Sequence, residues 1–479
     1  MAWTAPRRGL FAQAMTIAAP PRPWRTELRA TLALAAPLAA ANLLQMLVYA
    51  IDVVFVARLG EQALAASSLS ISLFGLMMWC LSGLTGACAP LIAAELGQRA
   101  HAVREVRRSV RMALWLAVGL GLVGMAIAAC GEAILLATGQ DPAVSALAGD
   151  FLGVLLWAMI PMVLANVLRT FVSALGRPFF ATAITLLAIA VNALGNYAFV
   201  FGHFGAPRLE LIGSALSSVL TGLVTLAAYV VAIRSDRRLR RYAIFGRWWR
   251  PEWRRLREIL VIGVPIMLTI LAEAGLFSGA AFLMGRIGAA ELAGHTVALQ
   301  VAALAFQVPF GIGQAATIRV GYFYGAGDRA GIARAGWAAM GVSLAFMIFT
   351  AGAMLLAPRA ILSLYVDPDA ARNAAMVGFA LQYMVIAAAF QLFDGTQAVA
   401  LGALRGLQDT RTPMAIAMFG YWVVGLATSL WFGFWTPLAG QGVWLGLAVG
   451  LVVVAALLTL RWSRRERLGL VPVTHPPAQ

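Results

Sequence analysis

Three carboxylates lie inside long apolar stretches of this 479-residue chain: Asp52, Glu273 and Asp394. An ionised carboxylate at the centre of a bilayer costs at least about 2.5–3.5 kcal/mol on insertion scales, so such residues usually serve a function. No basic residue is expected at mid-helix beside them. The carboxyls must then be protonated or paired with a mobile cation, and Na⁺ could bind at any of the three. The alternatives are structural hydrogen bonds between helices, or helix ends that lie in water.

Glutamines accompany two of these acids at helical spacing. Gln45 lies two turns before Asp52, and Gln391 and Gln397 flank Asp394 at i−3 and i+3. Residues three or four positions apart share one face of a helix. We therefore expect the amides to support cation or substrate binding at the carboxylates.

Asparagines in two further apolar stretches could face Asp52. Asn192 and Asn196 lie one turn apart in one stretch, and Asn166 lies in another. We expect them to complete a carboxylate site with Asp52, although amides also commonly join membrane helices. Carboxylates beside amide oxygens suit both Na⁺ and H⁺, so the ion is left open.

The composition places these residues in a membrane protein. The chain is 61% apolar, and its 12% of charged residues is about half the usual fraction of a soluble domain. Its apolar runs reach roughly 20 residues, enough to cross a hydrocarbon core of about 30 Å. The runs predict an all-α polytopic membrane protein with twelve transmembrane helices, at 31–56, 64–94, 110–130, 149–174, 179–202, 211–233, 258–284, 291–322, 333–357, 373–402, 413–435 and 439–461.

The positive charges predict the orientation of these spans. All 36 positive residues are arginine, against 20 acids. Cytoplasmic flanks of membrane helices collect positive charge. If both termini are cytoplasmic, 31 arginines fall on the inner side, and the outer side holds only Arg58, Arg208, Arg286, Arg359 and Arg372. This separation predicts an integral protein of the plasma (inner) membrane with both ends in the cytoplasm.

The chain divides into five expected segments. They are a cytoplasmic tail at 1–30, a six-helix lobe at 31–233, a basic linker at 234–257, a second six-helix lobe at 258–462 and a cytoplasmic tail at 463–479. The linker holds ten arginines together with Trp248, Trp249 and Trp253. Arginine interleaved with tryptophan is typical of a helix lying on anionic lipid headgroups. We expect the linker to contact the bilayer in this way.

A repeat relates the two lobes. Seven residues recur 228 positions later with the same type, namely Pro37, Arg58, Gly60, Leu64, Ala65, Gly83 and Gly97, matched by Pro265, Arg286, Gly288, Leu292, Ala293, Gly311 and Gly325. Six helices is an even number, so both lobes should have the same orientation. Parallel-repeat transporters of this kind bind their substrate between the lobes. The repeat therefore predicts a cleft between two parallel-repeat lobes and transport by alternating access.

Several other classes of function are excluded. The arginines adjoin no long polar segment, as nucleic-acid binding would require. Three cysteines, Cys80, Cys88 and Cys130, lie in apolar runs without the spacing of a disulfide framework or zinc site. The four histidines show no ligand spacing. We therefore expect no enzyme activity, no cofactor and no nucleic-acid partner.

Three segments resemble the multidrug and toxic compound extrusion (MATE) family, in its NorM-like branch. They are Tyr49-Ala-Ile-Asp-Val-Val-Phe-Val-Ala-Arg-Leu-Gly60, the stretch from Asn192 to Pro207, and Phe393-Asp-Gly-Thr-Gln-Ala-Val-Ala-Leu-Gly-Ala-Leu-Arg-Gly406 running on to Pro413. The likeness covers residues 28–465.

The resemblance implies a cation-coupled antiporter, driven by Na⁺ or H⁺, that exports amphipathic and often cationic drugs and toxic organic compounds. It also implies that Asp52 is the coupling acid of the first lobe, accompanied by Asn192 and Asn196. Glu273 and Asp394 would be the acidic pair of the second lobe. Asn166 matches a position where NorM-like chains can carry another amide.

Two further expectations concern the substrate and the assembly. Tyr421 or Trp422 could supply apolar contact with varied drugs, although packing against lipid is the simpler role for either one. The alternative function is a lipid-linked oligosaccharide flippase of the same superfamily shape, which would need a cationic site rather than acids. The protein is expected to act as a monomer.

Overall fold

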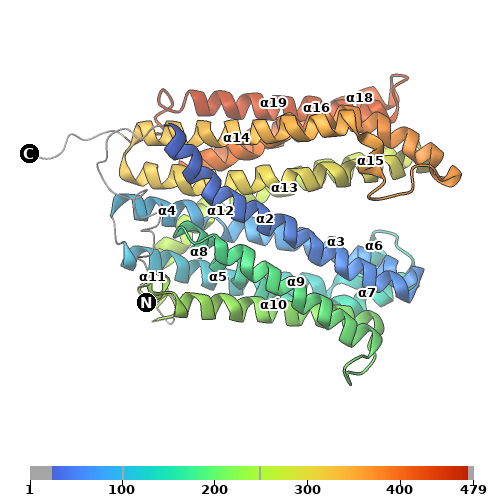
Figure 1. Ribbon diagram of the computed structural model, residues 1–479, viewed down its shortest axis with the longest axis horizontal. Helices are drawn as coiled ribbons and strands as arrows, with labels where there is room; N and C mark the ends of the chain where they lie inside the picture. The colour runs from blue at the N-terminus through green and yellow to red at the C-terminus, as the bar shows by residue number, and fades with distance from the viewer. Residues whose placement is uncertain (1–23, 100–101, 247–249, 473–479) are drawn as a thin grey trace, which may run out of the picture. The chain divides into compact units, whose positions relative to one another are not determined.

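The computed structural model describes residues 24–99, 102–246 and 250–472. The described residues form helices and turns without a strand (Figure 1). The helices are α2 (Trp24–Val56), η1 (Ala57–Leu59), α3 (Glu61–Thr85), α4 (Cys88–Gln98), α5 (Val103–Ala129), α6 (Gly131–Ala137), α7 (Pro142–Leu155), η2 (Leu156–Ala158), α8 (Met159–Ala174), α9 (Phe179–Phe201), α10 (Glu210–Ser235), α11 (Arg237–Arg240), α12 (Trp253–Ile287), α13 (Ala289–Ala326), α14 (Arg329–Leu356), α15 (Pro358–Leu362), η3 (Ala371–Asn373), α16 (Ala374–Gly406), α17 (Arg411–Met418), η4 (Phe419–Leu426), α18 (Ala427–Phe434) and α19 (Gly440–Ser463).

Twelve helical stretches of the described chain are long and apolar enough to cross a membrane. Each coincides with one of the twelve spans predicted from the sequence, so the all-helical membrane fold is confirmed. The second stretch is formed by α3 with α4, the fourth by α7, η2 and α8, and the eleventh by α17, η4 and α18.

The helices extend beyond the predicted spans at several ends. The helix α5 begins at Val103 and takes in the arginines that precede its apolar run. At 1.5 Å per residue, the 35 residues of α12 measure about 52 Å, against a hydrocarbon core of about 30 Å. An apolar run therefore predicts only the part of a helix that lies in hydrocarbon. The helix itself is longer, because the charged residues at its ends also form backbone hydrogen bonds.

Contacts within the chain group the described residues into two compact units. Unit 1 is drawn from Met1–Ala39, Ala93–Ala102 and Leu276–Gln479, and unit 2 from Ala40–Ile92 and Val103–Gly275. In unit 1, α13, α16 and α19 run alongside one another (Figure 1). In unit 2, α9 and α10 form an adjacent pair, and α8 packs against α10.

The sequence repeat has a structural counterpart. Pro37 lies inside α2 and Pro265 inside α12. Each of these helices is followed by a glycine at the start of the next, Gly60 before α3 and Gly288 before α13. The two halves therefore begin with the same arrangement, a long helix containing proline followed by a glycine break.

Within unit 1, the glycines near the ends of α4 and α13 each lie against the backbone of the other helix. A Cβ atom on Gly97 would lie 1.9 Å from the carbonyl oxygen of Tyr322, and one on Gly325 would lie 1.9 Å from that of Ala94. These distances leave no space for a side chain, so the two backbones touch at repeat-related positions.

The described part of the linker is packed on unit 2. Leu239, Tyr242 and Ile244 are almost completely buried, and the Tyr242 ring meets the edge of Phe171 at 5.9 Å. Only the four-residue helix α11 and turns are found between Ser235 and Gly246. This stretch forms no continuous helix, because apolar anchors fold it against the protein. Trp248 and Trp249 lie outside the described residues, as do 1–23 of the expected N-terminal tail and 473–479 of the C-terminal tail.

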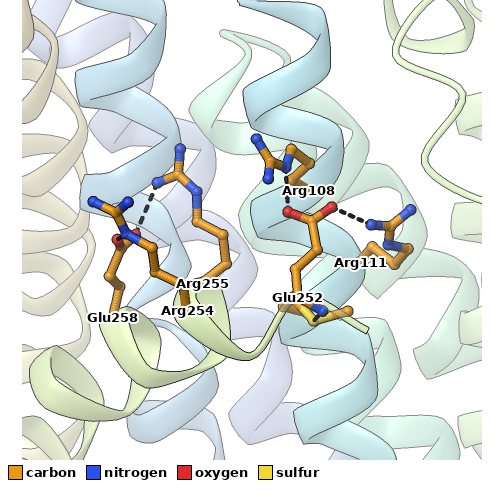
Figure 2. A network of polar contacts seen from close by, with 7 residues as sticks. Arg108, Arg111, Glu252, Arg254, Arg255 and Glu258 are labelled. Carbon is orange, nitrogen blue, oxygen red and sulfur yellow. Dashed lines mark hydrogen bonds and ion pairs between the residues drawn. The ribbon is translucent and has the colours of Figure 1, made fainter. Parts of the chain in front are cut away.

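Ion pairs fix the end of the linker and the start of α12 (Figure 2). The Glu252 carboxylate pairs with Arg108 and Arg111 of α5. Within α12, Glu258 pairs with Arg254 and Arg255. These carboxylates are thus charge-compensated, whereas many other arginines of the linker are exposed.

Candidate functional site

Asp52 lies near the end of α2, where its side chain is only 5% exposed. Asn192 and Asn196 of α9 donate from Nδ2 to its Oδ1 atom, at 3.0 and 2.8 Å. Their spacing of one helical turn places both amides on one face of α9. The structure therefore brings Asp52, Asn192 and Asn196 together inside unit 2.

A third donor to this carboxylate was not predicted from the sequence. The Ser218 hydroxyl of α10 donates to Asp52 Oδ2 at 3.3 Å. Ser217, beside it, donates to the backbone oxygen of Asn192 at 2.9 Å. The available signal was a polar stripe at helical spacing on an otherwise apolar helix, formed by Ser214, Ser217, Ser218 and Thr221, all of which are buried.

The oxygens of this cluster suit a small cation. The Asn192 and Asn196 Oδ1 atoms are buried and have no hydrogen-bond partner among the described residues. Hard cations prefer carboxylate and amide oxygens, and a buried polar atom without a partner is costly. The arrangement can thus bind a proton on Asp52, or a cation between the carboxylate and the amide oxygens. No group of three acids, histidines or cysteines suited to a metal occurs in the described part of the chain.

Asp394 forms a second polar cluster, in unit 1. It lies in the middle of α16 and is 5% exposed. Gln397 donates from Nε2 to its Oδ1 atom at 3.0 Å. The Tyr421 hydroxyl in turn donates to Gln397 Oε1 at 2.5 Å. Tyr421, which we considered as a contact for drugs, is fully buried in this network, whereas Trp422 is 46% exposed.

The remaining candidates occupy more varied positions. Glu273 is half-buried in α12, and Gln45 is half-buried in α2. Gln391 is buried in α16, and neither its Nε2 nor its Oε1 atom has a hydrogen-bond partner among the described residues. Asn166 of α8 donates to the Ser82 carbonyl oxygen at 3.5 Å, which places its side chain against α3.

Arg169 and Arg319, which were counted on the inner side, lie within predicted spans. Arg169 of α8 donates to Asn42 of α2. Arg319 of α13 forms a bidentate pair with Glu27 of α2, at 2.9 Å from Nε to Oε1 and 2.6 Å from Nη2 to Oε2. Each guanidinium thus has a partner other than the three predicted carboxylates.

The MatE family profile matches the sequence twice, over residues 37–198 and 265–431. The two matches begin at Pro37 and Pro265, the first residues of the repeat. Together they cover more than half of the chain.

Curated relatives match over nearly the full chain. "Probable multidrug resistance protein NorM" of Mesorhizobium japonicum is 44% identical over 451 residues, which are 94% of this chain and 97% of the relative. "Multidrug resistance protein NorM" of Burkholderia vietnamiensis is 37% identical over 93% of this chain and 96% of its own length.

Solved structures share the fold. A MATE transporter of the MOP superfamily in an outward-facing conformation matches with a TM-score of 0.83 at 20% identity, covering 93% of this chain and 96% of that one. The eukaryotic MATE transporter AtDTX14 matches with a TM-score of 0.79 at 20% identity, covering 94% of this chain and all of that one. The family match and the curated relatives lead to one conclusion: this chain is an integral membrane transporter of the MATE family, in its NorM-like branch.

Proposed function

We propose that the protein exports amphipathic, often cationic drugs and toxic organic compounds in exchange for Na⁺ or H⁺. Asp52, Glu273 and Asp394 are the cation-coupling acids, with Asn192 and Asn196 supporting Asp52. The names of the NorM relatives support multidrug export. The observation that carries cation coupling is the buried Asp52 carboxylate, with three donors around it and two amide oxygens without partners beside it.

The mechanism is competition between states of one transporter. Cation binding at a carboxylate favours one conformation and substrate binding favours the other, and alternating access exposes the acids to each side of the membrane in turn. The coupling cannot exceed the difference in affinity between the two states. One charge entering across 100 mV contributes about 2.3 kcal/mol, which sustains a substrate ratio of about 40- to 50-fold.

Efflux of ethidium from energised vesicles, under imposed sodium and pH gradients, tests this function. We expect Asp52→Asn and Asp394→Asn each to reduce gradient-driven efflux to the background rate, because an amide cannot exchange a proton or neutralise a cation. Glu273→Gln should weaken it similarly. Asp369→Asn is the matched control, since this carboxylate is exposed in a loop. Efflux at the wild-type rate in both aspartate variants would exclude the coupling assignment.

The flippase alternative is not favoured by the charges. A pyrophosphate-linked substrate needs positive groups, whereas Arg169 and Arg319 are engaged with Asn42 and Glu27. Movement of a fluorescent lipid-linked oligosaccharide, without dye efflux, would support the flippase instead.

The proposal also covers the oligomeric state of the protein, its location and its contacts with lipid. The transporter is a monomer of the inner membrane with both termini in the cytoplasm, and the linker arginines contact anionic headgroups. Arg237, Arg238, Arg240 and Arg241 are exposed and available for such contacts. Replacing these four arginines by glutamine should weaken retention of phosphatidylglycerol by the purified protein. Light scattering of the detergent-solubilised protein measures its oligomeric state and so tests whether it is a monomer.

A further inference from the structure

Tyr421 lies in an unusual stretch of helix. Residues Phe419–Leu426 form the π-helix η4, between the α-helices α17 and α18. Short π-helical segments inside α-helices often mark functional sites, because they change the direction in which the following side chains point. The stretch is strongly apolar, and its Tyr421 hydroxyl donates to Gln397 inside unit 1.

Glycines allow the π-helix to lie directly on α19. A Cβ atom on Gly420 would lie 2.2 Å from Cγ2 of Val454, and one on Gly450 would lie 2.7 Å from the Cα atom of Gly425. Larger residues at these positions would push the two helices apart. This close contact between the helices fixes how far the Tyr421 ring, which is fully buried, extends toward α16.

The hydroxyl selects the orientation of the Gln397 amide. An amide side chain has one acceptor end and one donor end. Because the Tyr421 hydroxyl donates to Oε1, the Nε2 end is turned toward Asp394 and donates to its Oδ1 atom at 3.0 Å. A hydrogen bond donated to a carboxylate stabilises its ionised form.

We propose that Tyr421 is a positioning residue that sets the cation affinity of Asp394 through Gln397. The inference rests on the proposed role of Asp394 as a coupling acid. With Tyr421 in place, the amide stabilises the empty, ionised carboxylate and so opposes cation binding. Without the hydroxyl the amide can turn over, and its oxygen then accepts from a protonated carboxyl or binds Na⁺ beside the carboxylate. The pair keeps the affinity low enough for the ion to be released in each cycle.

The test is Tyr421→Phe in proteoliposomes, with dye exchange measured against the concentration of the driving cation. We expect the half-saturating cation concentration to fall about tenfold, near the low end for the loss of one hydrogen bond to a charged group. Tyr383→Phe is the matched control. Tyr383 is also a buried tyrosine, and its hydroxyl has no hydrogen-bond partner among the described residues.

A double-mutant cycle separates positioning from general packing. If Tyr421 acts through Gln397, Tyr421→Phe should have no further effect on the half-saturating concentration in a Gln397→Leu background. An unchanged value in the single variant, or an equal shift in both backgrounds, would overturn the inference.

The variant Asp394→Asn separates failure of the positioning role of Tyr421 from failure of the coupling role of Asp394. If this variant loses coupling while Tyr421→Phe behaves as wild type, only the positioning role fails. If it retains full coupled exchange, the proposed function itself fails at this site. Thermal denaturation of each variant identifies loss of folding.

Discussion

At the scale of single residues, Asp52 and Asp394 both accept hydrogen bonds from amide side chains. Asp52 accepts from three side chains on neighbouring helices, whereas the Gln397 that donates to Asp394 lies on the same helix. Donors on separate helices can separate when the helices move. Cation affinity at Asp52 should therefore respond to movement of α9 and α10 relative to α2.

Ser218→Ala tests the donor that the sequence analysis missed. Removing one hydrogen bond worth about 1 kcal/mol should change the half-saturating cation concentration about fivefold. The value should fall if the ion is a proton, because the ionised carboxylate loses a donor. It should rise if the ion is Na⁺, which loses a candidate oxygen ligand. Dye exchange in proteoliposomes measures both, and Ser214→Ala, whose buried hydroxyl has no described partner, should leave the value unchanged.

The sequence could supply the acids and asparagines because polar residues stand out in apolar runs. It could not supply the serines as readily, since a hydroxyl can bond to its own helix backbone and is common in membrane helices. Nor could it predict that Asn166 faces α3, because the rotation of a helix about its axis depends on its neighbours.

At the scale of elements, the twelve spans were predictable and their interruptions were not. Apolar length fixes the number of crossings, as the match with all twelve predicted spans shows. The π-helix η4 depends on the fit of Gly420 and Gly425 against α19, which no local pattern encodes. The packing of the linker could not be predicted for a related reason, since the burial of Tyr242 depends on a surface formed elsewhere in the chain.

The close contact of α4 with α13 gives a prediction for stability. Gly97→Ala should lower the thermal denaturation temperature in detergent, because its Cβ atom would overlap the Tyr322 carbonyl oxygen and overpacking costs about 1–3 kcal/mol. Gly119→Ala in α5 is the control, since its added Cβ would meet no atom within 4 Å beyond the adjoining backbone of its own helix. Equal denaturation temperatures for the two variants would show that this contact is not tight in solution.

At the scale of the whole molecule, one ion pair joins distant parts of the chain. Glu27 and Arg319 are 292 positions apart, and their side chains are only 1% and 5% exposed. The Arg319 guanidinium also lies 5.0 Å from the Phe323 ring centroid. This pair fixes α2, the first helix of the described residues, to α13 inside unit 1.

Breaking that pair from one side should destabilise the protein strongly. Glu27→Leu leaves a buried guanidinium without its carboxylate, a change that typically costs about 3–5 kcal/mol. The double variant Glu27→Leu with Arg319→Met should recover much of the loss, because apolar side chains of similar volume can replace a buried pair. Thermal denaturation in detergent measures both. A double variant as unstable as the single one would mean that the arginine contributes mainly through other contacts.

Unit 1 combines segments of the chain that are synthesised at different times. Residues of α2 up to Ala39 belong to unit 1, most of which is synthesised last. At about 5–20 residues per second, the 292 positions between Glu27 and Arg319 correspond to about 15–60 s of translation. During that interval α2 emerges with a carboxylate whose partner does not yet exist. The final packing of α2 against α13 is therefore a late step of biogenesis.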